Sequence, residues 1–286
     1  MEVRMEYLRP REIETAMRAC PILFLPLGTI EWHGEHNVVG VDAVKAHALC
    51  VRAAEQAGGL VNPPLYGGVG GLSEPHTFVF DPEDELDPVL LPPWLDQLCR
   101  ETARNGFKAA IILTGHYGAA QQMAVRRVAT RMTESLGIPI LGTPEYFLAL
   151  DEKYYGDHAA FFETSIMMHL FPDSVDLSRL GEEPHRGVGG RDPKRFANAG
   201  DGKRFCDAII RRLAHLARRM PQWDAATVQR FLLAENALVQ RQCQMARKGD
   251  VVWAAWRHVS DGVLDTYPRL LEEERFEDIV KLAEAL

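Results

Sequence analysis

A short polar segment near the N-terminus carries residues whose types and spacing suit metal binding. Glu31 and His33 lie two residues apart, directly after an apolar run over residues 22–27. In extended chain, residues two apart point to the same side, so these two side chains can face one centre. Asp42 follows beyond a short loop. Mixed carboxylate and imidazole ligation is typical of zinc, manganese or iron. The pattern therefore predicts a metal site, and the alternative for an isolated Glu-X-His match is an exposed charged loop.

Two later segments carry further candidates. His116 stands between glycines directly after an apolar run over residues 109–113, where a loop hydrogen bond is the alternative to a ligand role. Asp157 and His158 open a second segment, which runs into an apolar helical stretch containing Glu163. An Asp-His pair can act as an oriented proton shuttle. The alternative for Asp157 is a plain helix N-cap, which is compatible with an additional role.

The elements that must position these residues alternate between apolar runs and helical patterns. Strands are predicted at 22–27, 60–65, 108–113 and 138–141, with helices at 42–56, 94–104 and 121–136. Helices at 204–220, 225–248 and 272–286 and a strand at 251–256 are predicted in the last third. Such alternation predicts an α/β fold, with a mostly parallel sheet covered by helices on both faces. The polar clusters then fall at the carboxyl ends of the strands, where ligands bind in such sheets.

Bulk properties narrow the class of protein. The 286 residues favour one domain over residues 1–286. The net charge of −8 argues against nucleic acid or an anionic membrane as a partner, but not against a small polar substrate. Neither a membrane span nor an apolar signal core is visible, which predicts a cytoplasmic protein. The five cysteines are odd in number and scattered, which favours reduced, mostly buried thiols.

These segments together resemble the creatininase (creatinine amidohydrolase) family. The family's motifs have the form LPxGSxExHGxHLPxxTD, NGHxxN, DHAGxxETS and GDPxxAxxxG. Their counterparts here run in the same order along the chain, at residues 25–42, 114–118, 157–165 and 190–200. The last of the four matches is the weakest, and the final third of the chain matches no motif.

The resemblance implies a three-layer α/β/α sandwich and a centre with two divalent metal ions, zinc first, with manganese or iron as alternatives. It implies Glu31 and His116 on one metal, His33 on the other, and Asp42 between the two. It further implies His158 as the catalytic histidine. Asp157 would lie beside it. Many members of the family are hexamers, so a homo-oligomer is expected.

The chain departs from the family pattern at two places that bear on the site. Gly118 stands where creatininase itself has a glutamate that binds the second metal, and Glu163 is the expected substitute. The segment around Ser73 carries an insertion, which predicts a changed substrate pocket and argues against creatinine itself as the substrate. Ser73 and Tyr117 are the expected substrate contacts. The alternative for Tyr117 is an ordinary packed tyrosine.

The leading functional hypothesis is a metal-dependent hydrolase of a small, polar, cyclic amide or formamide. A cation that activates water for attack on a carbonyl carbon, with His158 passing a proton to the leaving group, would cleave a C–N bond. One alternative is hydrolytic ring opening of a keto-cyclitol or keto-sugar, which breaks a C–C bond by the same attack. A second alternative, a catalytically silent metal-binding subunit, is disfavoured by the Asp-His pair.

Overall fold

A parallel sheet forms the centre of the fold. The computed structural model describes residues 2–72, 74–81, 88–246 and 261–286. Its strands are β1 (Ile22–Gly28), β2 (Leu60–Val61), β3 (Leu65–Tyr66), β4 (Ala109–Thr114) and β5 (Ile140–Pro144). The order is β2-β1-β4-β5, with β3 also pairing with β1, and every ladder between these strands is parallel. The α/β class predicted from the alternating pattern is therefore confirmed.

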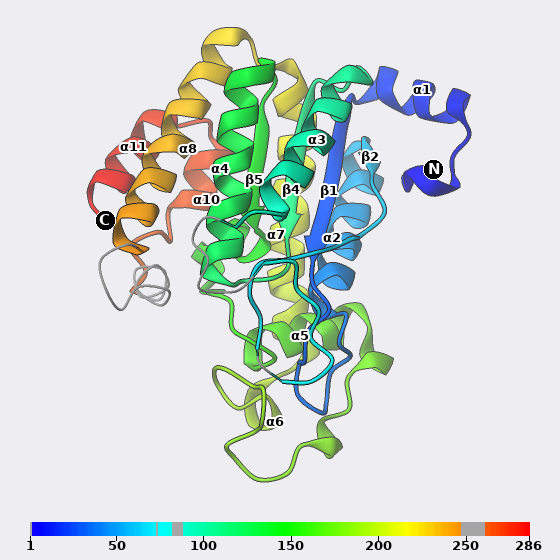
Figure 1. Ribbon diagram of the computed structural model, residues 1–286, viewed down its shortest axis with the longest axis vertical. Coiled ribbons are helices and arrows are strands. Elements are labelled where there is room, and N and C mark those ends of the chain that lie inside the picture. Colours follow the sequence, from blue (N-terminus) through cyan, green and yellow to red (C-terminus); the bar gives the residue numbers. More distant parts are fainter. Residues whose placement is uncertain (1, 73, 82–87, 247–260) are drawn as a thin grey trace.

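Helices cover both faces of this sheet and give the three layers that were predicted (Figure 1). One face carries α2 and α7, the other carries α3 and α4, and α8 and α11 pack outside α4. The helix bounds are α1 (Pro10–Ala19), α2 (Val41–Ala57), α3 (Leu91–Arg104), α4 (Ala119–Leu136), α5 (Phe161–Leu170), α6 (Pro193–Phe196), α7 (Ala199–Arg219), α8 (Ala225–Ala246), α10 (Tyr267–Glu272) and α11 (Phe276–Glu284). None of the helices in the described part of the chain is both long and apolar enough to cross a bilayer.

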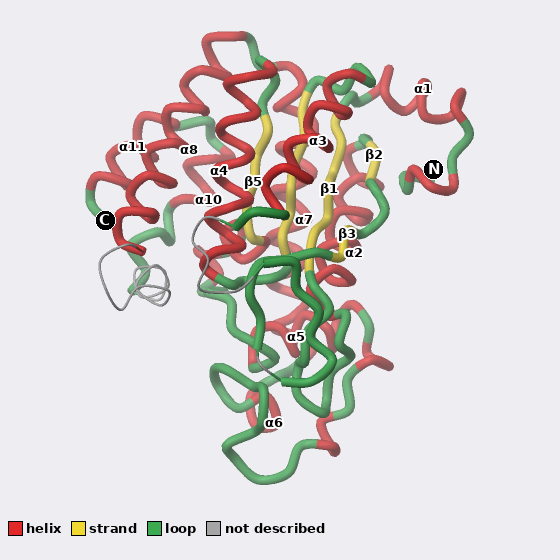
Figure 2. The backbone as a smooth tube through the Cα atoms, viewed as in Figure 1, coloured by secondary structure: helices red, strands yellow, loops and turns green. Residues whose placement is uncertain are grey.

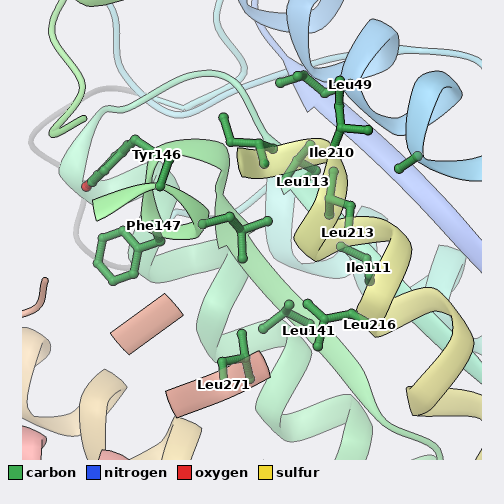
Figure 3. Close-up of a cluster of buried hydrophobic side chains, with 14 of the residues drawn as sticks. Leu49, Ile111, Leu113, Leu141, Tyr146, Phe147, Ile210, Leu213, Leu216 and Leu271 are labelled. Atoms are coloured by element: carbon green, nitrogen blue, oxygen red, sulfur yellow. The ribbon is translucent and has the colours of Figure 1, made fainter. Parts of the chain in front are cut away.

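The strands are apolar throughout because each of their faces meets a different core. Successive side chains of a strand point to opposite faces. Ile22 and Phe24 therefore join the core under α2 and α7, whereas Leu23 and Leu25 join the core under α3 and α4. Figure 3 shows part of the first core, where α7 packs its leucines over β4 and β5. A strand buried on both faces is typical of a parallel sheet.

One predicted element is divided in the structure, and another begins later than predicted. Residues 60–65 form two short strands instead of one, because Pro63 and Pro64 offer no N–H to a ladder. The predicted helix at 272–286 is α11, which begins at Phe276 because a turn in which Glu274 has a φ of 56° separates it from α10, a helix that was not predicted. Helix α1 was not predicted. The predicted strand at 251–256 and the last residues of the predicted helix at 225–248 lie outside the described residues.

Close packing at the carboxyl ends of β1 and β4 places the first turn of α2. A Cβ on Gly28 would lie 2.2 Å from the backbone nitrogen of Ala43, and one on Gly115 would lie 2.1 Å from the carbonyl oxygen of Asp42. Only glycine allows the helix to approach both strand ends this closely. Figure 2 shows the long loops gathered below this end of the sheet. The arrangement fixes Asp42 at the edge where the strands deliver their polar residues.

A similar close contact fixes α5 against α7, and it yields a test of the packing. A Cβ on Gly202 would lie 1.8 Å from the carbonyl oxygen of Ser165. We expect Gly202→Ala to lower the free energy of unfolding by about 1–3 kcal/mol, because overpacking outweighs the helix propensity that alanine adds. Gly181→Ala is the matched control, since its added Cβ meets nothing within 4 Å. Urea unfolding of both variants measures the difference, and equal stabilities would contradict the packing account.

Candidate metal centre

Asp42 lies at the middle of a buried cluster of carboxylates and imidazoles. Its Oδ1 is 3.2 Å from Nε2 of His33, and its Oδ2 is 3.2 Å from Nδ1 of His116. The same His116 nitrogen is 3.1 Å from Oε2 of Glu31, and His33 Nε2 is 3.5 Å from Oε2 of Glu163. All five side chains are at least nine-tenths buried. They form two groups of three potential ligands that have Asp42 in common, and these are the five residues predicted as metal ligands.

Several polar atoms in this cluster lack hydrogen-bond partners within the protein and are placed so that a cation could bind them. Oε2 of Glu31, Nε2 of His33 and Oδ2 of Asp42 are buried and have no hydrogen-bond partner. Burying a polar atom without a partner is costly, and buried charges are normally paired or bound to metal. The donor set of carboxylate oxygens and imidazole nitrogens suits zinc or manganese. The residues present therefore fit a metal site.

Backbone carbonyls orient three histidines toward the cluster. His33 uses Nδ1 to contact the Glu31 carbonyl at 3.0 Å, and His116 uses Nε2 to contact the Val69 carbonyl at 3.1 Å. His158 uses Nε2 to contact the Trp32 carbonyl at 2.8 Å. A carbonyl oxygen can only accept, so each of these nitrogens carries the proton and donates it. The other nitrogen of each ring then faces the cluster, the arrangement in which metal-binding histidines are usually held.

The charges of the cluster shift its proton affinities strongly. Burial acts to raise the pKa of Asp42, but His33 and His116 outweigh it and hold that pKa well below its usual value. Burial acts to lower the pKa of both histidines, and the neighbouring carboxylates raise it well above the ordinary value. Without metal, protons on the two imidazoles thus balance the carboxylates. Metal ligation requires neutral imidazole, so a cation and these protons compete for the same nitrogens.

Glu163 reaches the cluster from α5, and Gly118 borders the same cavity without a side chain to offer as a ligand. A Cβ on Gly118 would lie 3.0 Å from Nε2 of His116 and 3.1 Å from the Val69 carbonyl that holds this ring. A side chain at this position would therefore crowd the His116 ring unless that ring shifted slightly. Glu163 instead directs Oε2 to His33 and accepts a hydrogen bond from the Ala159 N–H at 2.7 Å.

His158 borders this cluster, and its pairing differs from the one expected. Its Nδ1 is 3.9 Å from Oε2 of Glu31, and burial lowers the pKa of the imidazole. Both oxygens of Asp157 accept backbone N–H groups at the start of α5, from Phe162 at 2.7 Å and Glu163 at 3.1 Å. The Trp32 carbonyl, and not Asp157, therefore holds the His158 ring. Burial also raises the pKa of Asp157 to about 7. Asp157 thus performs the capping function stated as its alternative, although the N-cap position itself is occupied by Ala160.

A cavity of about 460 Å³ opens onto the cluster, a size that suits a small ligand. Much of its wall is backbone, because six of the lining residues are glycines: Gly71, Gly118, Gly156, Gly187, Gly189 and Gly190. Tyr117 also lines it, but its hydroxyl is hydrogen-bonded to Glu145 and Tyr154. That contact favours the packed tyrosine over the substrate contact. Ser73, the other predicted contact, lies outside the described residues.

Two buried charged residues beneath the cluster were not predicted. Lys45, on α2, forms an ion pair with Glu163 and lies 3.3 Å from Oε1 of Glu145. Burial acts to lower the pKa of Lys45, but the carboxylates outweigh it and raise that pKa above its usual value. Burial raises the pKa of Glu145 to about 7. Lys45 lies three residues after Asp42, so helical spacing puts it near the same site. That was the signal in the sequence that could have revealed it.

Comparisons with known proteins agree with this architecture. The family model of creatininase, described as creatinine amidohydrolase, matches residues 6–217. The creatinine amidohydrolase of Pseudomonas putida is 30% identical over 190 residues, which cover 57% of this chain and 69% of that protein. The manganese form of creatininase is 27% identical, with a TM-score of 0.60, over 77% of this chain and 100% of that one. A mutant creatininase of the zinc–zinc type is 25% identical, with a TM-score of 0.63, over 77% and 99% of the two chains.

The match spans the elements that deliver the cluster, from β1 through α5, and continues into α7. The similar structures are covered almost completely, so their whole fold is present here. The chain therefore belongs to the creatininase family.

Proposed function

We propose that this protein is a metal-dependent hydrolase that cleaves a C–N bond in a small, polar, cyclic amide or formamide. One observation carries the proposal: two buried groups of three ligands share Asp42, and one atom each of Glu31, His33 and Asp42 has no hydrogen-bond partner. We assign Glu31, Asp42 and His116 to one divalent cation, and His33, Asp42 and Glu163 to a second. Manganese and zinc–zinc forms of creatininase support either metal.

The chemistry follows from where protons are held. A bound divalent cation lowers the pKa of water and polarises a carbonyl group. Nδ1 of His158 carries a lone pair, because Nε2 donates to the Trp32 carbonyl. Its lowered pKa leaves the ring neutral near pH 7, so Nδ1 accepts a proton from the attacking water and delivers it to the leaving nitrogen. Asp157 acts on this step by fixing the start of α5, and a steering role for it stays a prediction.

The cavity limits the size and polarity of the substrate. About 460 Å³ of space with glycine-rich walls suits a compact ring with polar edges. Gly118 differs from creatininase itself, so creatinine is not the proposed substrate. We also predict that the protein is a homo-oligomer, with a hexamer expected from the family resemblance. A cytoplasmic location stays a prediction. Assays on lactams, formamides and cyclic ketones distinguish C–N cleavage from the alternative C–C ring opening.

The most direct test of the proposed site replaces the shared carboxylate. We expect Asp42→Asn to lower the metal content from about two ions per chain to near zero, because the amide removes the charge common to both groups. Turnover of any substrate found should be lost with the metal. Elemental analysis of the purified protein measures the change. Asp207→Asn, on the exposed part of α7, is the control that should keep its metal. Full metal content in Asp42→Asn would refute the assignment.

The role of His158 can be separated from that of a ligand. We expect His158→Ala to keep its metal and to slow turnover by about a hundredfold, the scale for a lost general acid–base. The test is needed because His158 also lies within reach of a cation between Glu31 and His33. His169→Ala, near the end of α5 and away from the cavity lining, should change little. Loss of metal from His158→Ala would make this residue a ligand.

Competition between metal and protons predicts a pH dependence of stability. The pKa values of His33 and His116 are raised by folding, so their contribution to the metal-free protein is full below pH 6.5. It is lost as the pH rises through the folded values. A bound metal replaces these protons, so the rise in Tm caused by metal should grow from about pH 6 to about pH 8.5. Thermal unfolding with and without metal measures this, and a constant or falling difference would contradict it.

A further inference from the structure

Lys45 is a fully buried cation directly beside the proposed second metal position. It ion-pairs with Glu163, and its Nζ lies 3.3 Å from Oε1 of Glu145 and 4.0 Å from Oδ1 of Asp42. The ammonium also lies 4.1 Å from the centre of the Tyr117 ring. Carboxylates from three elements thus face Lys45: α2, α5 and the turn at Glu145–Leu148. Burial on all sides leaves little water to screen its charge.

The contacts of Lys45 are not shared equally between the two ligand groups. Oδ1 of Asp42, the oxygen nearer to Lys45, is the one that faces His33. Oδ2, which faces His116, belongs to the group with Glu31. Among the described ion pairs, the partners of Glu31 are histidines only, whereas Glu163 pairs with both His33 and Lys45. The ammonium of Lys45 therefore lies beside the ligand group with Glu163, and no lysine pairs with Glu31 among the described ion pairs.

We propose that Lys45 makes the two metal positions unequal, so that the cation at His33–Asp42–Glu163 binds more weakly than the cation at Glu31–Asp42–His116. The ammonium repels a divalent ion at the first of these positions and competes with it for the charge of Glu163. A cation held by Asp42 and Glu163 would lie close to Nζ, which contacts both carboxylates, and like charges close together in a buried site interact strongly. The inference rests on the proposed two-metal centre and adds an order to its loading. The Glu31 position fills first, and the His33 position exchanges its ion.

The test is a titration of the full-length, metal-free protein with Mn²⁺, in which the EPR signal of free Mn²⁺ counts the bound ions. Mn²⁺ suits the test because it prefers carboxylate ligands to thiols, and four of the five cysteines are also buried. The wild type should bind two ions with dissociation constants that differ at least about tenfold. Lys45→Met removes the charge at similar length. It should tighten the weaker step at least about tenfold and leave the tighter step nearly unchanged.

Two further variants keep the test decisive. Lys45→Gln removes the charge but keeps hydrogen-bond donors for Glu163 and Glu145, so it should also tighten the weaker step, even if Lys45→Met does not fold. Glu163→Gln should shift the same step in the opposite direction. Lys203→Met, which removes an exposed lysine of α7, is the control and should change neither step.

The outcomes separate this inference from the function on which it rests. A wild type that binds no Mn²⁺ or Zn²⁺ would overturn the proposed metal centre. Two equal steps in the wild type would overturn only the inequality. A weaker step that is unchanged or weakened in both neutral variants of Lys45 would show that its ammonium does not oppose the second ion, and would overturn the role given to this residue.

Discussion

The rest of the site depends on the sharing of one buried carboxylate by two buried imidazoles. Asp42 directs one oxygen to His33 and the other to His116, each at 3.2 Å. Glu31 and Glu163 bring two more carboxylates to the same water-poor region. Such a concentration of negative charge is unstable unless cations or protons neutralise it. In the metal-free protein, protons on His33 and His116, whose pKa values are raised, neutralise this charge. A divalent metal ion would neutralise it in place of these protons, and the arrangement of the side chains favours the metal.

The fold assembles this cluster by bringing the carboxyl ends of neighbouring strands together at one edge of the sheet. Because β1 and β4 are parallel neighbours, the loops that follow them deliver Glu31, His33 and His116 side by side. Gly28 and Gly115 let the first turn of α2 rest against both strand ends. Helix α5 then brings Glu163 from below, held by its contact with α7. The stability of these contacts therefore determines how accurately the ligands are placed.

Much of this arrangement could be predicted from the sequence because its signals are local. The apolar runs before Glu31 and His116 marked two buried strands, and the rule for parallel sheets placed their polar ends together. The break at Pro63-Pro64 was missed, although proline cannot donate to a ladder and so gave a local signal for it. The five candidate ligands converge as their spacing and the family resemblance implied.

What could not be predicted depends on contacts between distant residues. The hydrogen bond from His158 to the Trp32 carbonyl joins residues 126 positions apart, and no local pattern reveals it. The spacing of Lys45 from Asp42 places it near the site, but its contacts with Glu145 and Glu163 join residues at least 100 positions apart and have no local signal. The hydroxyl of Tyr117 likewise turns away from the cavity because of Glu145.

The central claim is that Asp42 lies between two metal ions. Anomalous diffraction from crystals of the manganese-loaded protein tests it most directly. The account predicts two peaks on either side of Asp42, one among Glu31, Asp42 and His116 and one among His33, Asp42 and Glu163. A single peak bound by His158, or peaks away from Asp42, would contradict it.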